Sequence, residues 1–218
     1  AGRERPYFSM YFSARVRMRV HSHQRHLDAL VRMAARRGVR RIMVHALTDG
    51  RDTTPTGGAD YIAALQRILE DVGAGQVTTV CGRYYGMDRD QRWDRTRCAY
   101  EAMTQGIGTH GTDPIHLLRE SYARGVTDEF LKPCVVTNGE NQPLGLLRND
   151  DAVIFFNFRA DRARELTRAF TDVAFDNFER SRVPTLTSFA TLTRYAANIP
   201  APCAFAPASI QNSLGEYI

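Results

Sequence analysis

The sequence predicts an α/β fold in which a mostly parallel sheet is flanked by helices in three layers. Two observations support this prediction. Segments with helical apolar spacing alternate with short apolar runs, and these runs end in loops rich in charged residues. With 218 residues, 43% of them apolar and 24% charged, the chain is long enough to bury a large core. Strands that alternate with helices favour parallel pairing, because each helix returns the chain to the same end of the sheet.

The first clear elements lie in the first 81 residues. Ser22 can cap a helix whose apolar residues recur at helical spacing, and Gly38 is suited to its C-terminal end. A β-branched and apolar run at 41–47 predicts a strand. A helix over 59–72 and a strand over 77–81 follow. This order of helix, strand, helix and strand is typical of a parallel α/β sheet.

The rest of the chain is expected to continue the alternation. Asp113 and Pro114 have the residue types of an N-cap and a first helical position, for a helix that ends at Gly125. Residues 151–158 are apolar enough for a central strand. The other expected elements are a helix over 91–105, a loop or hairpin over 137–149, a helix ending at Phe170, a strand over 183–193 and a proline-rich segment over 199–207.

The N-terminal end differs from the rest in charge and pattern. Residues 1–41 contain eleven arginines against Glu4 and Asp28, whereas the whole chain has a net charge of +5. Residues 1–19 show no clean helix or strand period. Their arginine-rich, acid-poor composition resembles a transit peptide, although the chain can equally be a piece of a longer protein. No nucleic-acid partner is expected, because the basic residues do not form a known motif interleaved with aromatics.

Cysteine spacing and hydropathy indicate a cytoplasmic protein. The four cysteines are far apart and form no CxxC pair, which favours reduced thiols over disulfides or a zinc site. No apolar run approaches the roughly 18 residues that a membrane-spanning helix needs. We therefore expect neither a membrane span nor a metal site in this chain.

An anion-binding site is predicted from residues 82–95, which read GRYYGMDRDQRWDR. This stretch contains four arginines, three aspartates and three large aromatic residues. A solvated helix face usually spaces opposite charges three or four residues apart and does not begin with Gly-Arg-Tyr-Tyr. We expect Arg83 and Arg89 to contact a ligand, and Arg92, Trp93 and Arg95 to brace the following helix.

Three strand ends each supply arginine together with aspartate. Guanidinium groups suit bidentate contact with phosphate or carboxylate. For any single pair, a structural salt bridge is the more common explanation, but three at equivalent positions favour a binding site. His45 is expected to be a packed histidine, and residues 128–130 a turn that begins a helix. The junction residues are Arg51, Asp52, Arg83, Asp88, Arg89, Arg159, Asp161 and Arg162.

Together these strings resemble the phosphotransferase domain of the cofactor-independent (2,3-bisphosphoglycerate-independent) phosphoglycerate mutases. They occur in the family's order and spacing over about residues 20–218, which we take as the transferase domain. Residues 1–19 depart from the pattern, since the family has Ser-Asp-Gly-Gly where Val16-Arg17-Met18-Arg19 stand here. The matching strings are VHSH at 20–23, DGRDT at 49–53, residues 82–95, DEF at 128–130 and NFRADRAR at 157–164.

The resemblance implies a phosphoglycerate site with roles for particular residues. Asp52 becomes the candidate general base that activates the accepting hydroxyl group. The arginines would neutralise the carboxylate and phosphate groups of the substrate. The implied substrate-binding residues are His21, Arg51, Asp52, Arg83, Arg89, Arg159, Asp161 and Arg162.

The resemblance also implies what a complete enzyme would need. In this family 3-phosphoglycerate and 2-phosphoglycerate are interconverted through a phosphoserine, without bisphosphoglycerate. The serine and two manganese or magnesium ions belong to a separate phosphatase domain, and no segment here resembles its motifs. We therefore expect the chain alone to be inactive and the parent enzyme to be a monomer.

Two other readings of the sequence remain open. The chain could be a non-enzymatic anion-binding or RNA-binding module that uses its basic N-terminal end. It could also be another phosphosugar enzyme built on a similar domain, although a nucleophile or metal site for such an enzyme is not evident.

Overall fold

The computed structural model of the chain describes residues 8–13 and 21–206. Predictions for residues 1–7, 14–20 and 207–218 lie outside these ranges, including the departure at 16–19. The described residues form an eight-stranded sheet in the order β4-β5-β3-β2-β1-β6-β7-β8. The strands are β1 (Phe8–Ser13), β2 (Ile42–Thr48), β3 (Gln76–Gly82), β4 (Thr109–Gly111), β5 (Cys134–Val136), β6 (Ala152–Phe155), β7 (Ser188–Thr193) and β8 (Cys203–Phe205).

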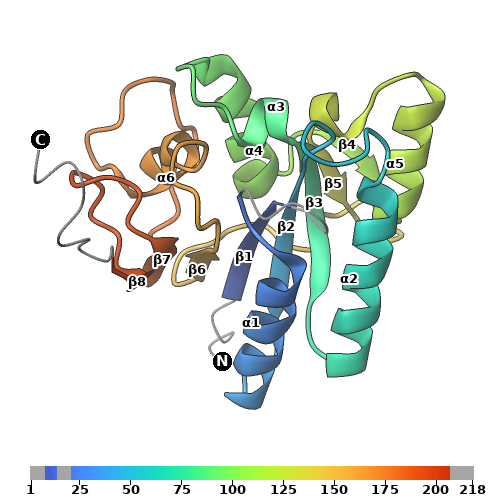
Figure 1. Cartoon of the computed structure of the whole chain (residues 1–218), viewed down its shortest axis with the longest axis horizontal. Helices are drawn as coiled ribbons and strands as arrows, with labels where there is room; N and C mark the ends of the chain where they lie inside the picture. Colours follow the sequence, from blue (N-terminus) through green and yellow to red (C-terminus); the bar gives the residue numbers. More distant parts are fainter. Residues whose placement is uncertain (1–7, 14–20, 207–218) are drawn as a thin grey trace, which may run out of the picture.

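Helices cover both faces of this sheet, which gives the predicted three layers (Figure 1). One face packs against the apolar sides of α1, α2 and α5, and the other against α4 and α6. Alternate residues of β2 point to opposite faces of the sheet: Val44 packs in the core against α1, α2 and α5, and Leu47 packs in the core against α4 and α6. The helices are α1 (Gln24–Arg36), α2 (Gly58–Val72), α3 (Arg83–Gly86), α4 (Trp93–Gln105), α5 (Pro114–Ala123), the 3-10 turn η1 (Asp128–Phe130) and α6 (Arg164–Thr171).

The prediction of a mostly parallel sheet is confirmed. Five strand pairs, from β3 through β2, β1, β6 and β7 to β8, are parallel, and β4 is parallel to β5. The exception is β5, which runs antiparallel to β3. Because the central strands are parallel, β2, β3 and β6 end on the same edge of the sheet.

Two predicted boundaries were wrong. The cap of α1 is His23, whose ring accepts a hydrogen bond from the Arg25 backbone N–H at 3.1 Å, whereas Ser22 is fully buried before it. The strand expected over 151–158 ends at Phe155. At this end of the strand the Tyr195 hydroxyl lies 2.8 Å from the carbonyl oxygens of both Phe155 and Asn157, which accept from it.

Several short elements were not predicted. Residues 8–13 form β1 within a segment expected to lack a pattern, and β8 lies in the proline-rich segment. The strand expected over 183–193 begins only at Ser188. The segment 137–149 is a loop with one antiparallel bridge between Thr137 and Pro143, not a hairpin of two strands. None of the described helices is long and apolar enough to cross a membrane.

Candidate anion-binding site

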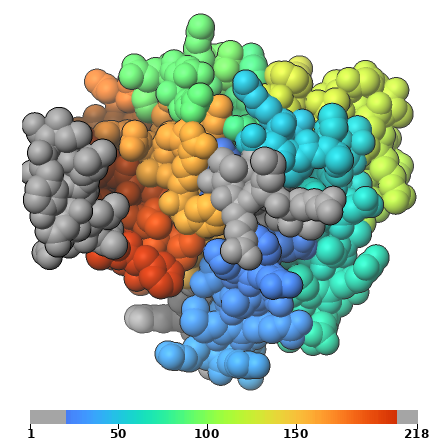
Figure 2. Space-filling view, in the orientation of Figure 1, coloured from blue at the N-terminus to red at the C-terminus, as the bar shows by residue number. Residues whose placement is uncertain are grey.

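The predicted arginine-rich junctions meet at the carboxyl edge of the parallel strands. The loops after β2, β3 and β6 carry them, and this edge is where α/β sheets bind ligands. In the space-filling view, the surfaces around residues 50–57 (cyan), 83–95 (green) and 156–163 (orange) all lie in the upper half of the molecule (Figure 2). Ion pairs join these three loops, since Arg83 lies 2.7 Å from Asp52 and Arg89 lies 2.9 Å from Asp161.

The loop after β2 is shaped by Asp49, a buried residue that the sequence analysis did not single out. Its carboxylate accepts hydrogen bonds from the backbone N–H groups of Arg51 and Asp52, at 3.1 and 2.8 Å. Gly50 supplies the positive φ of 66° that this tight turn requires. The turn places the Arg51 and Asp52 side chains at the rim of the sheet.

Arg83 lies at the centre of the site and is almost completely buried. One of its guanidinium nitrogens is 2.7 Å from an oxygen of Asp49 and 2.7 Å from an oxygen of Asp52. The same Asp52 oxygen is 4.0 Å from His21 Nε2. Three residues predicted from different parts of the chain, His21, Asp52 and Arg83, are therefore brought together.

A second group joins the loops after β3 and β6 through Asp161. Its carboxylate lies 2.9 Å from Arg89 and 2.7 Å from Arg159. Burial alone would raise the pKa of the Asp161 carboxyl, but hydrogen bonds from Arg159 and Arg89 outweigh it and hold the pKa below its usual value. Asp161 therefore stays ionised and keeps two exposed arginines side by side.

Arg162 differs from the other arginines of the site. Its guanidinium donates to the backbone carbonyl of Met87 at 3.0 Å, and within the described residues no carboxylate lies at ion-pair distance from it. Burial, together with the positive charges of Arg83, Arg89 and Arg51, lowers the pKa of its guanidinium. The group remains a cation, so it is a partly buried positive charge that a bound anion would stabilise.

Arg51 is the most peripheral of the predicted residues. Its side chain is 64% exposed, and its guanidinium lies 3.7 Å from Glu129 of η1. This long contact leaves the side chain able to turn toward a ligand. The contacts thus gather six of the eight predicted residues, His21 and Asp52 around Arg83, and Arg89 and Arg159 around Asp161. Arg51 and Arg162 instead contact Glu129 and the Met87 carbonyl.

Further residues that support the site were not in the predicted substrate-binding set, although Asp88 was among the junction residues. Asp88 accepts from the backbone of Asp90 and Arg92 and lies 3.2 Å from Arg95. Glu165 on α6 accepts from the Gln91 backbone at 2.9 Å. Asp88 belongs to the charged stretch 82–95 from which the anion-binding site was predicted. The sequence around Glu165 gives no such indication, because its partners are about 70 residues away in the chain.

The expectation for His45 is confirmed, and the contacts of Trp93 and Arg95 agree with the bracing role expected of them, whereas the Arg92 side chain is exposed. His45 is a fully buried histidine that hydrogen-bonds Thr79 at 2.9 Å, and burial lowers its pKa to about 3. Trp93 packs edge-on against Phe175, and Arg95 stacks on Tyr84, as expected for residues that brace the following helix. In the part of the chain that the structure describes, no group of three or more His, Cys, Asp or Glu residues could hold a metal ion.

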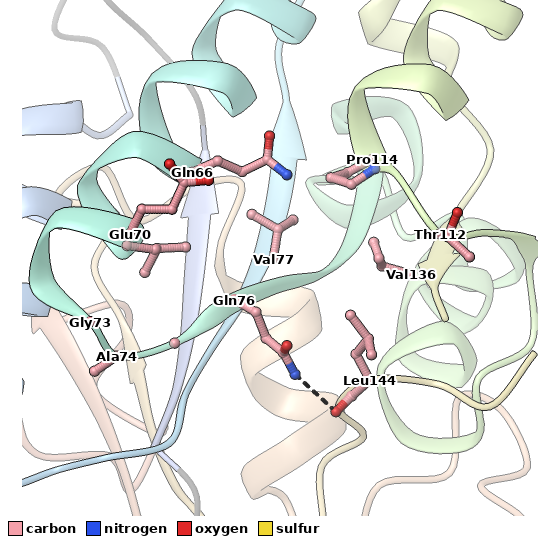
Figure 3. Close-up of a pocket in the computed structure, with 12 residues that line it drawn as sticks. Gln66, Glu70, Gly73, Ala74, Gln76, Val77, Thr112, Pro114, Val136 and Leu144 are labelled. Atoms are coloured by element: carbon pink, nitrogen blue, oxygen red, sulfur yellow. Dashed lines mark hydrogen bonds between the residues drawn. The ribbon is translucent and has the colours of Figure 1, made fainter. Parts of the chain in front are cut away.

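A separate cavity of about 340 Å³ lies elsewhere, between α2, the start of β3 and the start of α5 (Figure 3). Its lining includes Gln66, Glu70, Thr112 and Pro114, and Gln76 hydrogen-bonds the Leu144 carbonyl across it at 3.2 Å. No arginine lines this cavity. Its chemistry does not suit a multiply charged anion, so the candidate site remains the arginine-rich edge of the sheet.

Comparisons with known proteins agree with the resemblance seen in the sequence. Residues 17–197 match the family described as the BPG-independent PGAM N-terminus. Similar curated relatives include the 2,3-bisphosphoglycerate-independent phosphoglycerate mutases of Thermomicrobium roseum and Moorella thermoacetica, each 48% identical to this chain. Both alignments cover 91% of this chain, but only 38% and 39% of the relatives.

A solved structure shows the same fold. The chain matches a crystal structure of Leishmania mexicana phosphoglycerate mutase, determined at low cobalt concentration, with a TM-score of 0.87 and 29% sequence identity. The match covers 94% of this chain and 39% of that chain. Since the family match includes most of the sequence and the fold agrees with that of a solved mutase, the chain belongs to the family of BPG-independent phosphoglycerate mutase N-termini.

Proposed function

We propose that this chain supplies the substrate-holding part of a phosphoglycerate mutase that interconverts 3-phosphoglycerate and 2-phosphoglycerate. The observation that carries the proposal is the environment of Arg162, a partly buried cation that faces other arginines and has no carboxylate partner among the described residues. A small ligand with both a phosphate and a carboxylate group would relieve this repulsion. Its two anionic groups can each receive paired guanidinium hydrogen bonds.

In this proposal the two groups of residues have different tasks. Arg89, Arg159 and Arg162 bind one anionic group, with Asp161 keeping the first two in place. Arg51 closes over the ligand from the loop after β2. The substrate-binding set is His21, Arg51, Asp52, Arg83, Arg89, Arg159, Asp161 and Arg162.

Asp52 is the proposed general base. Its carboxylate is partly exposed and lies within 4.0 Å of His21 and 2.7 Å of Arg83. A carboxylate held in this way can accept a proton from the substrate hydroxyl that receives the phosphoryl group. His21 is then placed to hydrogen-bond the same hydroxyl or its proton acceptor.

The remaining chemistry is proposed to lie outside this chain, which spans about two fifths of the length of its curated relatives. The reactive serine and two manganese or magnesium ions would belong to a second domain. The described residues offer no donor set for such ions, so no step here depends on them. We further propose a monomeric, cytoplasmic parent enzyme whose partner is the small-molecule substrate, and no turnover by this chain alone.

Titration calorimetry of the chain with 3-phosphoglycerate tests the proposal. We expect Arg162→Ala and Arg159→Ala each to weaken binding by roughly 10- to 100-fold, because a charge-assisted hydrogen bond contributes about 1.5–3 kcal/mol. Arg97→Ala is the matched control, since Arg97 is an exposed arginine paired with Glu101 on the surface of α4. Equal affinities in all four proteins, or no binding by the unchanged chain at millimolar ligand, would refute the proposal.

A further inference from the structure

We propose that Asp128 is a positioning residue that holds the Arg51–Asp52 loop in its binding conformation from behind. The inference rests on the proposed function, because it assigns Arg51 and Asp52 to the substrate. Asp128 itself is 1% exposed and belongs to the turn η1, so it acts through the loop and not by touching a ligand.

Asp128 contacts both ends of the loop that runs from Thr48 to Gly58. At the beginning, the Thr48 hydroxyl donates to the Asp128 backbone carbonyl at 2.8 Å. At the other end, the Asp128 backbone N–H donates to the Pro55 carbonyl at 2.8 Å, and the Gly58 N–H donates to the Asp128 carboxylate at 2.7 Å. One residue thus closes the loop with its N–H, its C=O and its side chain.

The carboxylate also replaces the missing cap of α2. The N-cap position of this helix is Gly57, which has no side chain to satisfy the first free N–H groups. Asp128 accepts from Gly58, and the Tyr122 hydroxyl accepts from Ala59 at 3.2 Å while donating to Asp128 at 2.5 Å. A negative charge at a helix N-terminus is favourable, so the carboxylate fixes the point where the loop becomes helix.

The backbone of the same turn fits closely against two glycines of the site. A Cβ atom on Gly50 would lie 2.6 Å from the Glu129 nitrogen, and one on Gly82 would lie 2.4 Å from the Glu129 oxygen. Gly50 precedes Arg51, and Gly82 precedes Arg83. The turn η1 is therefore packed against the glycines that begin two arginine-bearing loops. Its residue Asp128 also hydrogen-bonds the first residue of α2 through its carboxylate.

The groups that interact with the Asp128 carboxyl are Tyr122 from α5, Tyr61 from α2 and Asp49 from the loop after β2, and Asp60 acts on the two tyrosines. Burial raises the pKa of Asp128 to about 6, and hydrogen bonds from Tyr122 and Gly58 oppose the shift. At pH 7.5 the group is therefore ionised and both oxygens accept. An asparagine replaces one of these two accepting oxygens with an NH2 group, which cannot accept from the Gly58 N–H or from the Tyr122 O–H.

Hydrogen exchange of the full chain at pH 7.5 tests this role with Asp128→Asn. We expect amide exchange in residues 49–58 to become at least tenfold faster, while exchange in β1, β6 and β7 is unchanged, and 3-phosphoglycerate affinity to fall at least fivefold. Asp151→Asn is the matched control. Asp151 is also 1% exposed and its pKa is also raised to about 6, but it lies before β6 at the other edge of the sheet, where it accepts from the Arg148 N–H.

Tyr122→Phe gives a second variant that removes one hydrogen bond from the same carboxylate and leaves the turn intact. It should accelerate exchange in the same segment by a smaller factor. The proposal is overturned if residues 49–58 exchange at the original rate in both variants, or if Asp151→Asn accelerates them equally. Failure of the unchanged chain to bind 3-phosphoglycerate would refute the proposed function instead, and the exchange rates would still decide whether Asp128 holds the loop.

Discussion

Arginines of identical chemistry have different environments in this site because their depth differs. The Arg83 side chain is 4% exposed and is held by two carboxylates, so much of its charge is already compensated. The Arg159 side chain is 45% exposed and shares Asp161 with Arg89. Exposed ion pairs contribute little to stability, so Arg159 can exchange its partner for a ligand at small cost. Arg83 is more important for holding the site together.

A substitution of Gly82 tests how closely the site loops approach one another. In Gly82→Ala, the new Cβ would lie 2.4 and 2.7 Å from the backbone oxygens of Glu129 and Asp128, which cannot move aside as a side chain can. We expect a loss of about 2–3 kcal/mol in the free energy of unfolding, typical of overpacking. Gly139→Ala is the control, because no atom lies within 4 Å of its Cβ position. Urea denaturation of both variants measures the difference, and equal midpoints would contradict the close approach.

At the scale of elements, sequence patterns identified the long helices and the strands β2 and β3, but they missed the central strand β1 and the three-residue strands. Regular apolar spacing over segments of five to fifteen residues predicted the bounds of α1, α2, α4, α5, β2 and β3 to within about two residues. The three-residue strands β4, β5 and β8 are too short to show a period. Their pairing depends on neighbours brought in by the rest of the fold. Local sequence also could not show that Tyr195, 40 residues further along, would hydrogen-bond the backbone at the end of β6.

The Tyr195 hydroxyl is expected to stabilise the end of β6 measurably. In Tyr195→Phe, the buried carbonyls of Phe155 and Asn157 lose their shared donor. We expect the free energy of unfolding to fall by about 1–3 kcal/mol, the usual cost of unsatisfied buried polar groups. Tyr84→Phe is the control, since the described residues include no hydrogen-bond partner for that hydroxyl. Chemical denaturation compares the two, and equal losses would show that the shared hydrogen bond is unimportant.

At the scale of the whole molecule, sequence predicted the candidate site residues but not how they are held. The arginines and their neighbouring aspartates stand out because charge is concentrated at strand ends. Asp49, Asp128 and Glu165 were not singled out as supports, because each has a partner from a distant segment and because their roles depend on burial. The sequence alone does not distinguish a solvent-exposed carboxylate from a buried one. Only the folded arrangement distinguishes them.

Glu165 should make the stability of the whole chain depend on pH. Burial, with the nearby negative charge of Asp88, raises the pKa of this carboxyl above its ordinary value. A carboxyl group whose pKa is higher in the folded than in the unfolded chain contributes its full stabilisation when the pH is below the unfolded-state pKa. This stabilisation is lost as the pH rises through the folded-state pKa. In Glu165→Gln this loss is absent, so the variant should gain stability relative to the original chain between pH 4.5 and 7.5. Urea denaturation at both pH values tests this, and a constant difference would contradict it.

The contact between Thr48 and the Asp128 carbonyl joins residues 80 positions apart, and the His21 carbonyl accepts from Phe158 far along the chain. Closing such long loops is slow, because entropy is lost before many contacts form. The arginines therefore cannot gather until nearly the whole domain has been synthesised and its sheet has assembled. The positively charged arginines approach one another only at that late step, when the aspartates that pair with them are brought into the same region.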